Sequence, residues 1–103
     1  MKKKIIETKN APAALGQYSQ GVQAGNFLFT SGQTGMDPKT GRLAGPDIAS
    51  QTRQTLENLK AILAAGGCSL DQVVKCSVYL QDINEFPEMN RIYAEYFPHN
   101  PPA

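Results

Sequence analysis

A chain of 103 residues is long enough for one domain and too short for two. Its 41% hydrophobic and 18% charged residues are ordinary for a globular domain and exclude a disordered chain. Ten basic and nine acidic residues give a net charge of +1, which favours neither nucleic acid nor a membrane as a partner. The two cysteines form no disulfide or zinc pattern, and the sequence shows no secretory signal and no apolar run of ~20 residues. These features predict a cytoplasmic protein.

Three short strands are predicted in the first third of the chain. Lys4 to Thr8 is a short edge strand, and Asn10 to Gly16 is a loop rich in alanine and proline. The runs from Tyr18 to Gln23 and from Phe27 to Ser31 are predicted to form a hairpin. The turn between them, Ala24 to Asn26, contains Gly and Asn, which tolerate positive φ.

Two amphipathic helices follow a turn-rich stretch from Gly32 to Pro46. Asp47 is a plausible N-cap for the first helix, and Gly66-Gly67 ends it with a left-handed cap. Residues of this helix recur at spacings of three and four: Ile48, Thr52, Leu56, Leu59, Ile62 and Leu63. The second helix shows the same spacing at Phe86, Met89, Tyr93 and Phe97, with Pro87 in its first turn, and ends at His99 to Ala103.

A fourth strand is predicted from Val73 to Gln81, after a capping box at Ser69 and Gln72. Its alternation predicts one buried face, made of Val74, Cys76, Val78 and Leu80. The order β, β, β, α, β, α predicts an α+β fold with both helices on one sheet face and a right-handed crossover through the first helix. This count leaves the sheet short, so we expect a further strand or two after the second helix.

Common catalytic and metal-binding motifs do not occur in the sequence. It contains no G-x-x-x-x-G-K loop, no H-E-x-x-H, no C-x-x-C and no G-x-S-x-G. His99 is the single histidine and lies beside prolines, so we expect a solvated loop residue and no histidine-based metal site. Cys68, between two small residues, is predicted to be a loop residue and not a nucleophile, and Cys76 a core residue.

Two segments bring a hydroxyl group next to glycines at a strand end. One runs from residue 11 to 21 and contains Tyr18, and the other runs from 27 to 35 and contains Ser31. A glycine at such a place lets a ligand approach backbone N–H groups closely. The residues alone leave open whether Tyr18 and Ser31 bind a ligand or are ordinary turn and strand residues.

Segments spread in order along the chain are similar to motifs of one family. They are Ala11 to Gly21, Phe29 to Gln33 with the turn Pro38 to Gly41, Gln51 to Leu59, Val74 to Asp82 and Asn90 to Phe97. On these motifs the sequence is identified as a member of the RidA/YjgF family of 2-iminobutanoate/2-iminopropanoate deaminases. It departs from the family pattern at Gln17, where a proline is usual, and at Met36-Asp37.

The resemblance implies a chorismate-mutase-like α+β fold with a mixed sheet, assembled as a homotrimer with clefts between subunits. It also implies hydrolysis of 2-iminopropanoate and 2-iminobutanoate to the keto acid and ammonia, without cofactor or metal. Tyr18 and Ser31 match catalytic positions. Gly32, Asn90 and Tyr93 match substrate-binding positions.

The resemblance further places an arginine that binds the substrate carboxylate, a glutamate that positions the attacking water, and the last strands of the fold after Ala103. We therefore expect the 103 residues alone to be unstable or inactive. The alternative is a non-catalytic trimer that binds a small metabolite or acts as a chaperone or regulator. Ribonuclease activity, which relatives have been assigned, is third, because a net charge near zero argues against nucleic acid.

Overall fold

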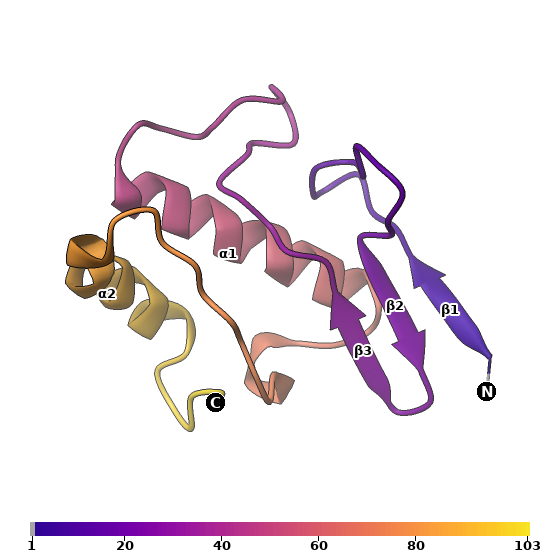
Figure 1. Ribbon diagram of the computed structural model, residues 1–103. Helices are drawn as coiled ribbons and strands as arrows, with labels where there is room; N and C mark the ends of the chain where they lie inside the picture. Colours follow the sequence, from indigo (N-terminus) through magenta and orange to yellow (C-terminus); the bar gives the residue numbers. More distant parts are fainter. Residues whose placement is uncertain (1) are drawn as a thin grey trace.

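Three antiparallel strands and two helices make up residues 2–103, the part of the chain that the computed structural model describes (Figure 1). The strands are β1 (Lys3–Ile6), β2 (Gly21–Ala24) and β3 (Phe27–Thr30), and they lie side by side in the order β1-β2-β3. Gly25 adopts a φ of 59° in the turn between β2 and β3. The predicted hairpin is therefore confirmed, with its turn where glycine makes it possible.

Both predicted helices are present, with the predicted ends. In α1 (Ile48–Ala65), the Asp47 carboxylate accepts the Ser50 N–H at 3.0 Å, and Gly67 ends the helix at a φ of 79°. Two short 3₁₀ turns, η1 (Leu70–Gln72) and η2 (Ile83–Glu85), follow, and the predicted capping box of η1 is present. Helix α2 (Phe86–Tyr96) carries its proline in the first turn.

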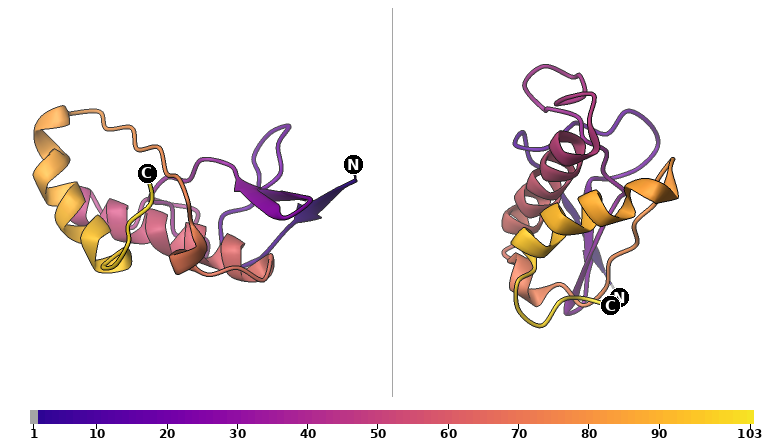
Figure 2. Two further views of the ribbon diagram at one scale, coloured as in Figure 1. Left: turned by 90° about the horizontal axis from the view of Figure 1, so that it is seen from below. Right: turned by 90° about the vertical axis from the view of Figure 1, so that its left-hand side faces the viewer.

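The two halves of α1 pack against different partners. In the C-terminal half, Ile62 is fully buried against Ile6 of β1, with Leu28 of β3 beside them. In the N-terminal half, Leu56 packs against Ile92 and the residues around the end of α2. Figure 2 shows this arrangement, with the sheet over one end of α1 and α2 alongside the other. Helix α1 therefore joins two small apolar clusters into one domain.

The strand predicted from Val73 to Gln81 is not formed. The segment is extended, but Val74 is 73% and Val78 is 47% exposed, so the expected buried face is not formed. Of the four residues predicted to face inward, Cys76 and Leu80 are partly buried, and Cys76 packs against the cluster of α1 and α2. A strand needs a ladder of partners, and within residues 2–103 this segment has only Ala103 as a backbone partner besides the turn bond from Val73 to Leu70.

That exchange has the pattern of a parallel pair. The Cys76 N–H donates to the Ala103 carbonyl at 2.8 Å, and the Ala103 N–H donates to the Val74 carbonyl at 3.0 Å. The predicted α+β class with two helices is confirmed. The prediction of a mixed sheet is not met among the described residues, because β1, β2 and β3 are all antiparallel and this single parallel exchange is too short to add a strand.

Candidate functional site

Ser31 and Gly32 lie directly after β3, where the chain leaves the sheet. The Ser31 N–H donates to the Gln20 carbonyl at 2.9 Å. The Ser31 hydroxyl donates to the same carbonyl and accepts from Gln33 Nε2, both over a long 3.3 Å. A hydroxyl has one proton and two lone pairs, so one lone pair of Ser31 Oγ remains free to accept an N–H from a ligand.

The glycine at position 32 has open space beside it. A methyl group built on Gly32 meets no atom of the chain within 4 Å, whereas one on Gly35 lies 2.6 Å from the Gln51 Cα. Gly35 is therefore needed for the close packing of its loop on α1, while nothing in the packing of one chain requires glycine at 32. The space beside Gly32 is available to a ligand or to a neighbouring molecule.

Tyr18 lies in the loop that leads into β2, and its side chain is 50% exposed. Its hydroxyl accepts the Leu15 N–H at 3.2 Å, and its own N–H donates to the Gly16 carbonyl at 2.9 Å. These contacts fold the ring back over its own loop and leave the hydroxyl proton unused. Tyr18 can therefore donate a hydrogen bond to an oxygen of a ligand.

Asn90 and Tyr93 lie on α2 and line a different surface. Together with Cys76, Met89 and neighbouring apolar side chains they border a groove of about 360 Å³ between α2 and the extended segment. Partial burial, and then the nearby Cys76 thiol, raise the pKa of the Tyr93 hydroxyl above its ordinary value. Tyr93 therefore stays protonated at neutral pH and can act as a donor but not as a base.

The five candidate residues thus fall into two groups. Tyr18, Ser31 and Gly32 belong to the β2–β3 end of the molecule, and the groove that Asn90 and Tyr93 line contains none of them. Strand β3 and helix α2 lie apart in Figure 1 and in the left view of Figure 2. Within one chain the five candidate residues therefore lie in two separate places.

Two buried amides that the sequence reasoning did not single out hold the loops that flank the first group. Gln20 is 3% exposed, and its side chain bonds only to backbone groups of residues 8 to 12. Asn58 is fully buried in α1, and its Nδ2 donates to the carbonyls of Thr34 at 3.2 Å and Met36 at 2.8 Å. A polar residue on the apolar face of a helix was the available signal for Asn58.

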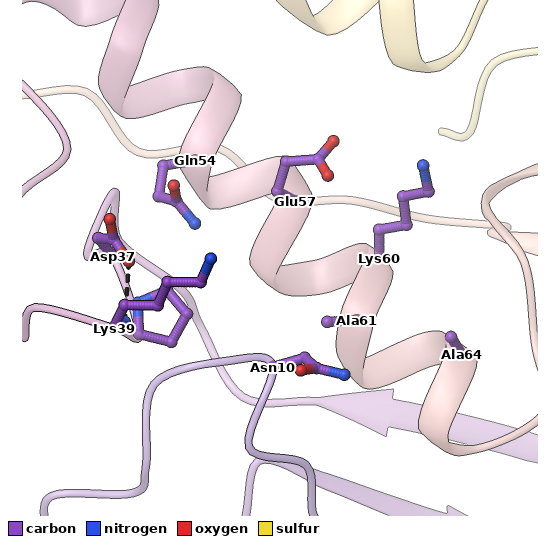
Figure 3. Close-up of a pocket in the computed structure, with 9 residues that line it drawn as sticks. Asn10, Asp37, Lys39, Gln54, Glu57, Lys60, Ala61 and Ala64 are labelled. Carbon is purple, nitrogen blue, oxygen red and sulfur yellow. Dashed lines mark hydrogen bonds between the residues drawn. The ribbon is translucent and has the colours of Figure 1, made fainter.

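A larger groove of about 470 Å³ lies between the turn at Asp37 and α1, and contains none of the five candidates (Figure 3). Its charged side chains are of both signs, Asp37 and Glu57 against Lys39 and Lys60, so no single charge of ligand is favoured there. Among the described residues, no group of three or more His, Cys, Asp or Glu is placed to hold a metal ion.

The fold and the placement of the candidate residues define a class of protein: a small α+β domain with hydroxyl and glycine residues exposed at a strand end. The profile of the family described as Endoribonuclease L-PSP matches residues 8–103. A RutC family protein of Pyrococcus horikoshii is 56% identical over 98% of this chain and 80% of its own. A 2-iminobutanoate/2-iminopropanoate deaminase of Rattus norvegicus is 48% identical over 98% of this chain and 74% of its own.

A solved structure shares the fold as well. The structure of Escherichia coli TdcF with bound serine superposes with a TM-score of 0.91 at 42% identity, covering 96% of this chain and 80% of that one. The chain therefore belongs to the RidA/YjgF family, whose profile bears the L-PSP description. None of the helices in residues 2–103 is long and apolar enough to cross a membrane.

Proposed function

We propose that this protein hydrolyses small 2-imino acids and their enamine tautomers, such as 2-iminopropanoate and 2-iminobutanoate. In this reaction water adds to the protonated C=N carbon, the C–N bond breaks, and the products are a 2-keto acid and ammonium. The observation that carries the proposal is the 48% identity, over 98% of the chain, to a protein named for this activity. No cofactor is needed, because the protonated imine carbon is already an electrophile.

The hydrogen bonds of Ser31 and Tyr18 suit such a substrate. The free lone pair of Ser31 Oγ can accept an N–H of the iminium group, and the unused proton of Tyr18 can reach a substrate oxygen. The open space beside Gly32 lets a small planar acid approach the strand end. Ser31 and Tyr18 are proposed as catalytic residues, and Gly32, Asn90 and Tyr93 as substrate-binding residues.

The complete site is proposed to form between subunits of a homotrimer. This assembly would allow the Tyr18–Ser31 group of one subunit to face the Asn90–Tyr93 group of another, which a single subunit keeps apart. The outer face of the sheet supports assembly, since Phe27 and Phe29 are each 61% exposed on it. An arginine and a glutamate after Ala103 are part of the proposal, as partner of the substrate carboxylate and as base for the water.

The test is consumption of 2-iminobutanoate generated in place by a threonine dehydratase. The protein expressed from its complete gene is expected to accelerate formation of the keto acid above the spontaneous rate. Ser31→Ala and Tyr18→Phe should each lower kcat/KM by about 10- to 100-fold. Absence of acceleration by the wild-type protein would remove the proposal.

A second candidate is a trimer that binds a metabolite without catalysis, and the bound serine of the TdcF structure favours it. Calorimetric binding of serine or a 2-keto acid together with no imine hydrolysis would support this candidate. Cytoplasmic location belongs to either proposal, and the free thiols of Cys68 and Cys76 are consistent with a reducing compartment.

A further inference from the structure

We propose that Gln20 is a positioning residue that fixes the Tyr18 loop and the Ser31 strand end relative to each other. The inference rests on the proposed function, because it concerns the same site. Gln20 itself does not touch substrate: it is 3% exposed and lies behind the two residues that are proposed to do so.

The side chain of Gln20 holds the loop that leads to Tyr18. Its Oε1 accepts the Thr8 N–H at 2.7 Å. Its Nε2 donates to the carbonyls of Thr8 at 3.1 Å, Ala11 at 3.2 Å and Pro12 at 2.7 Å. Two amide protons are thus shared among three carbonyls, and the loop that runs on to Tyr18 is tied to the start of β2 at its buried end.

The backbone of Gln20 holds Ser31 at the end of β3. Its carbonyl accepts both the N–H of Ser31 at 2.9 Å and the Ser31 hydroxyl at 3.3 Å. These two bonds set the rotamer of Ser31, and with it the direction of the lone pair that is left for substrate. One residue therefore connects the donor of the proposed site, Tyr18, to its acceptor, Ser31.

No other amide of the described chain duplicates this connection. Gln33 reaches the Ser31 hydroxyl but not the Tyr18 loop. Asn58 holds the loop after Gly32 and contacts neither the Tyr18 loop nor Ser31. A displacement of about 1 Å between groups that orient a substrate can lower the rate about 100-fold. Gln20 should therefore affect the reaction step as well as stability.

The experiment uses the full chain with Gln20→Asn, which keeps the amide but shortens its reach. Gln23→Asn is the matched control, because Gln23 lies three residues further on, in β2, and its amide makes only a long 3.5 Å bond to the Gly25 carbonyl. Gln20→Asn is expected to lower kcat/KM by about 10- to 100-fold, mainly through kcat, and Gln23→Asn by less than about twofold.

A double-mutant cycle with Tyr18→Phe separates positioning from general destabilisation. If Gln20 acts through Tyr18, adding Gln20→Asn to Tyr18→Phe should cost less than about threefold. The inference would be overturned if the double variant lowered kcat/KM by the product of the two separate effects. It would also be overturned if the Gln20→Asn enzyme were as active as the control. If Gln20→Asn does not fold, Thr8→Pro, which removes the N–H donor to Gln20 Oε1 together with the Thr8 hydroxyl that accepts the Asn10 N–H, takes its place in the cycle, with Thr8→Ala as the control for the lost hydroxyl.

Hydrogen exchange makes the result independent of the activity. The Thr8 amide, whose acceptor is Gln20 Oε1, should exchange faster in Gln20→Asn, and NMR of the Tyr18 ring should show increased mobility. An inactive wild type with these changes present would remove the deaminase proposal and keep the connection. An unchanged Thr8 amide and Tyr18 ring would remove the connection whether or not the wild type is active.

Discussion

At the scale of single residues, Gly32 and Gly35 lie in one loop, but different requirements explain why each is a glycine. Gly35 is buried against α1, and an added methyl group would lie 2.6 Å from the Gln51 Cα. Gly32, three residues earlier, is exposed and would place the same methyl group in open space. Fold stability therefore explains the glycine at 35, and the proposed ligand explains the glycine at 32.

Gly32→Ala is expected to leave stability unchanged or raise it by about 0.4–1 kcal/mol, because alanine loses less entropy on folding and meets no neighbour. The same change should lower kcat/KM for 2-iminobutanoate by about tenfold or more, by filling the space beside the substrate. Thermal melts and steady-state kinetics check both parts. Gly35→Ala is the control, and should lower the melting temperature; a Gly32→Ala protein with wild-type kinetics would contradict the prediction.

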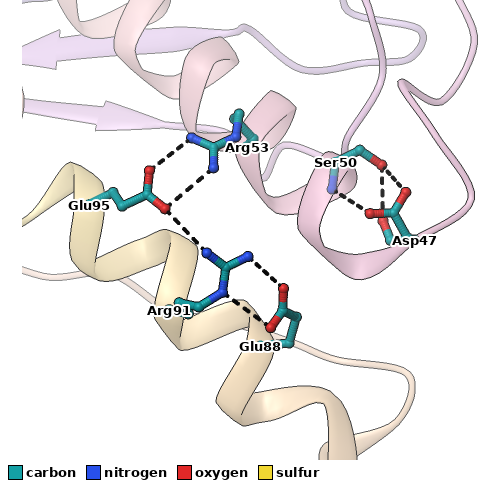
Figure 4. Close-up of polar contacts among 6 residues, drawn as sticks. All are labelled: Asp47, Ser50, Arg53, Glu88, Arg91 and Glu95. Carbon is teal, nitrogen blue, oxygen red and sulfur yellow. Dashed lines mark hydrogen bonds and ion pairs between the residues drawn. The ribbon is translucent and has the colours of Figure 1, made fainter.

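At the scale of elements, one ion pair joins α1 and α2 across their outer surface, and two further pairs within α2 extend it (Figure 4). Arg53 of α1 bonds Glu95 of α2 at 3.1 Å, and Arg91 bonds Glu88 at 2.7 Å with Glu95 3.8 Å away. All four side chains are about half exposed, so water and salt weaken these pairs. The apolar cluster around Leu56 and these pairs act on the same helix contact.

The ion pairs predict a loss of stability in acid. Hydrogen bonding to Arg53 lowers the pKa of Glu95, bonding to Arg91 lowers that of Glu88, and bonding to Ser50 lowers that of Asp47. A lowered folded-state pKa gives stability that is complete above the ordinary values, 4.5 for Glu and 3.8 for Asp, and is lost as the pH falls through the folded values.

Melting temperatures measured between about pH 6 and pH 3 should therefore fall towards the acid end. Glu95→Gln should flatten this fall, because it removes the carboxylate shared by two arginines. Glu7→Gln, at an exposed position outside these ion pairs, is the control and should keep the wild-type curve. An equally steep fall in Glu95→Gln would show that the helix ion pairs do not set the acid sensitivity.

At the scale of the whole molecule, the sheet has one covered and one open face. Leu28 and Ile6 face α1, while the register puts Ile5, Val22 and Phe29 in one row on the outer face. Ile5 is 48% and Phe29 is 61% exposed. Phe27 lies beside Phe29 with ring centroids 6.5 Å apart, so the outer face is a continuous apolar surface suited to a neighbouring subunit.

Phe29→Glu should therefore dissociate the proposed trimer, because it puts a charge at the centre of this face without disturbing the packing on α1. Light scattering coupled to size exclusion would show a monomer with a wild-type circular dichroism spectrum and no deaminase activity. Leu43→Glu, at a 55% exposed leucine outside the sheet, should stay trimeric and active. A trimeric Phe29→Glu protein would place the interface elsewhere.

The elements with local signals were predictable from the sequence, and the elements that need distant partners were not. Gly25, Asp47 and Gly67 set their turn and helix ends through their own backbone and side-chain chemistry, so the hairpin and α1 are where the pattern puts them. The segment from Val73 to Gln81 has an equally clear alternation, yet forms no strand. Its hydrogen bonds depend on a neighbour, and the described chain supplies only Ala103.

The candidate site, too, was predictable from the sequence only in part. Tyr18, Ser31 and Gly32 could be proposed from the sequence, since hydroxyl groups beside glycines at strand ends are visible in one segment at a time. The link between them through Gln20 could not, because it joins residues 8 to 12 with residue 31 through one buried amide. The sequence by itself therefore determined the family, the helices and the hairpin, through local backbone chemistry and motifs. Only the tertiary structure decided which polar groups meet, because a buried amide must find its hydrogen-bond partners wherever the fold places them.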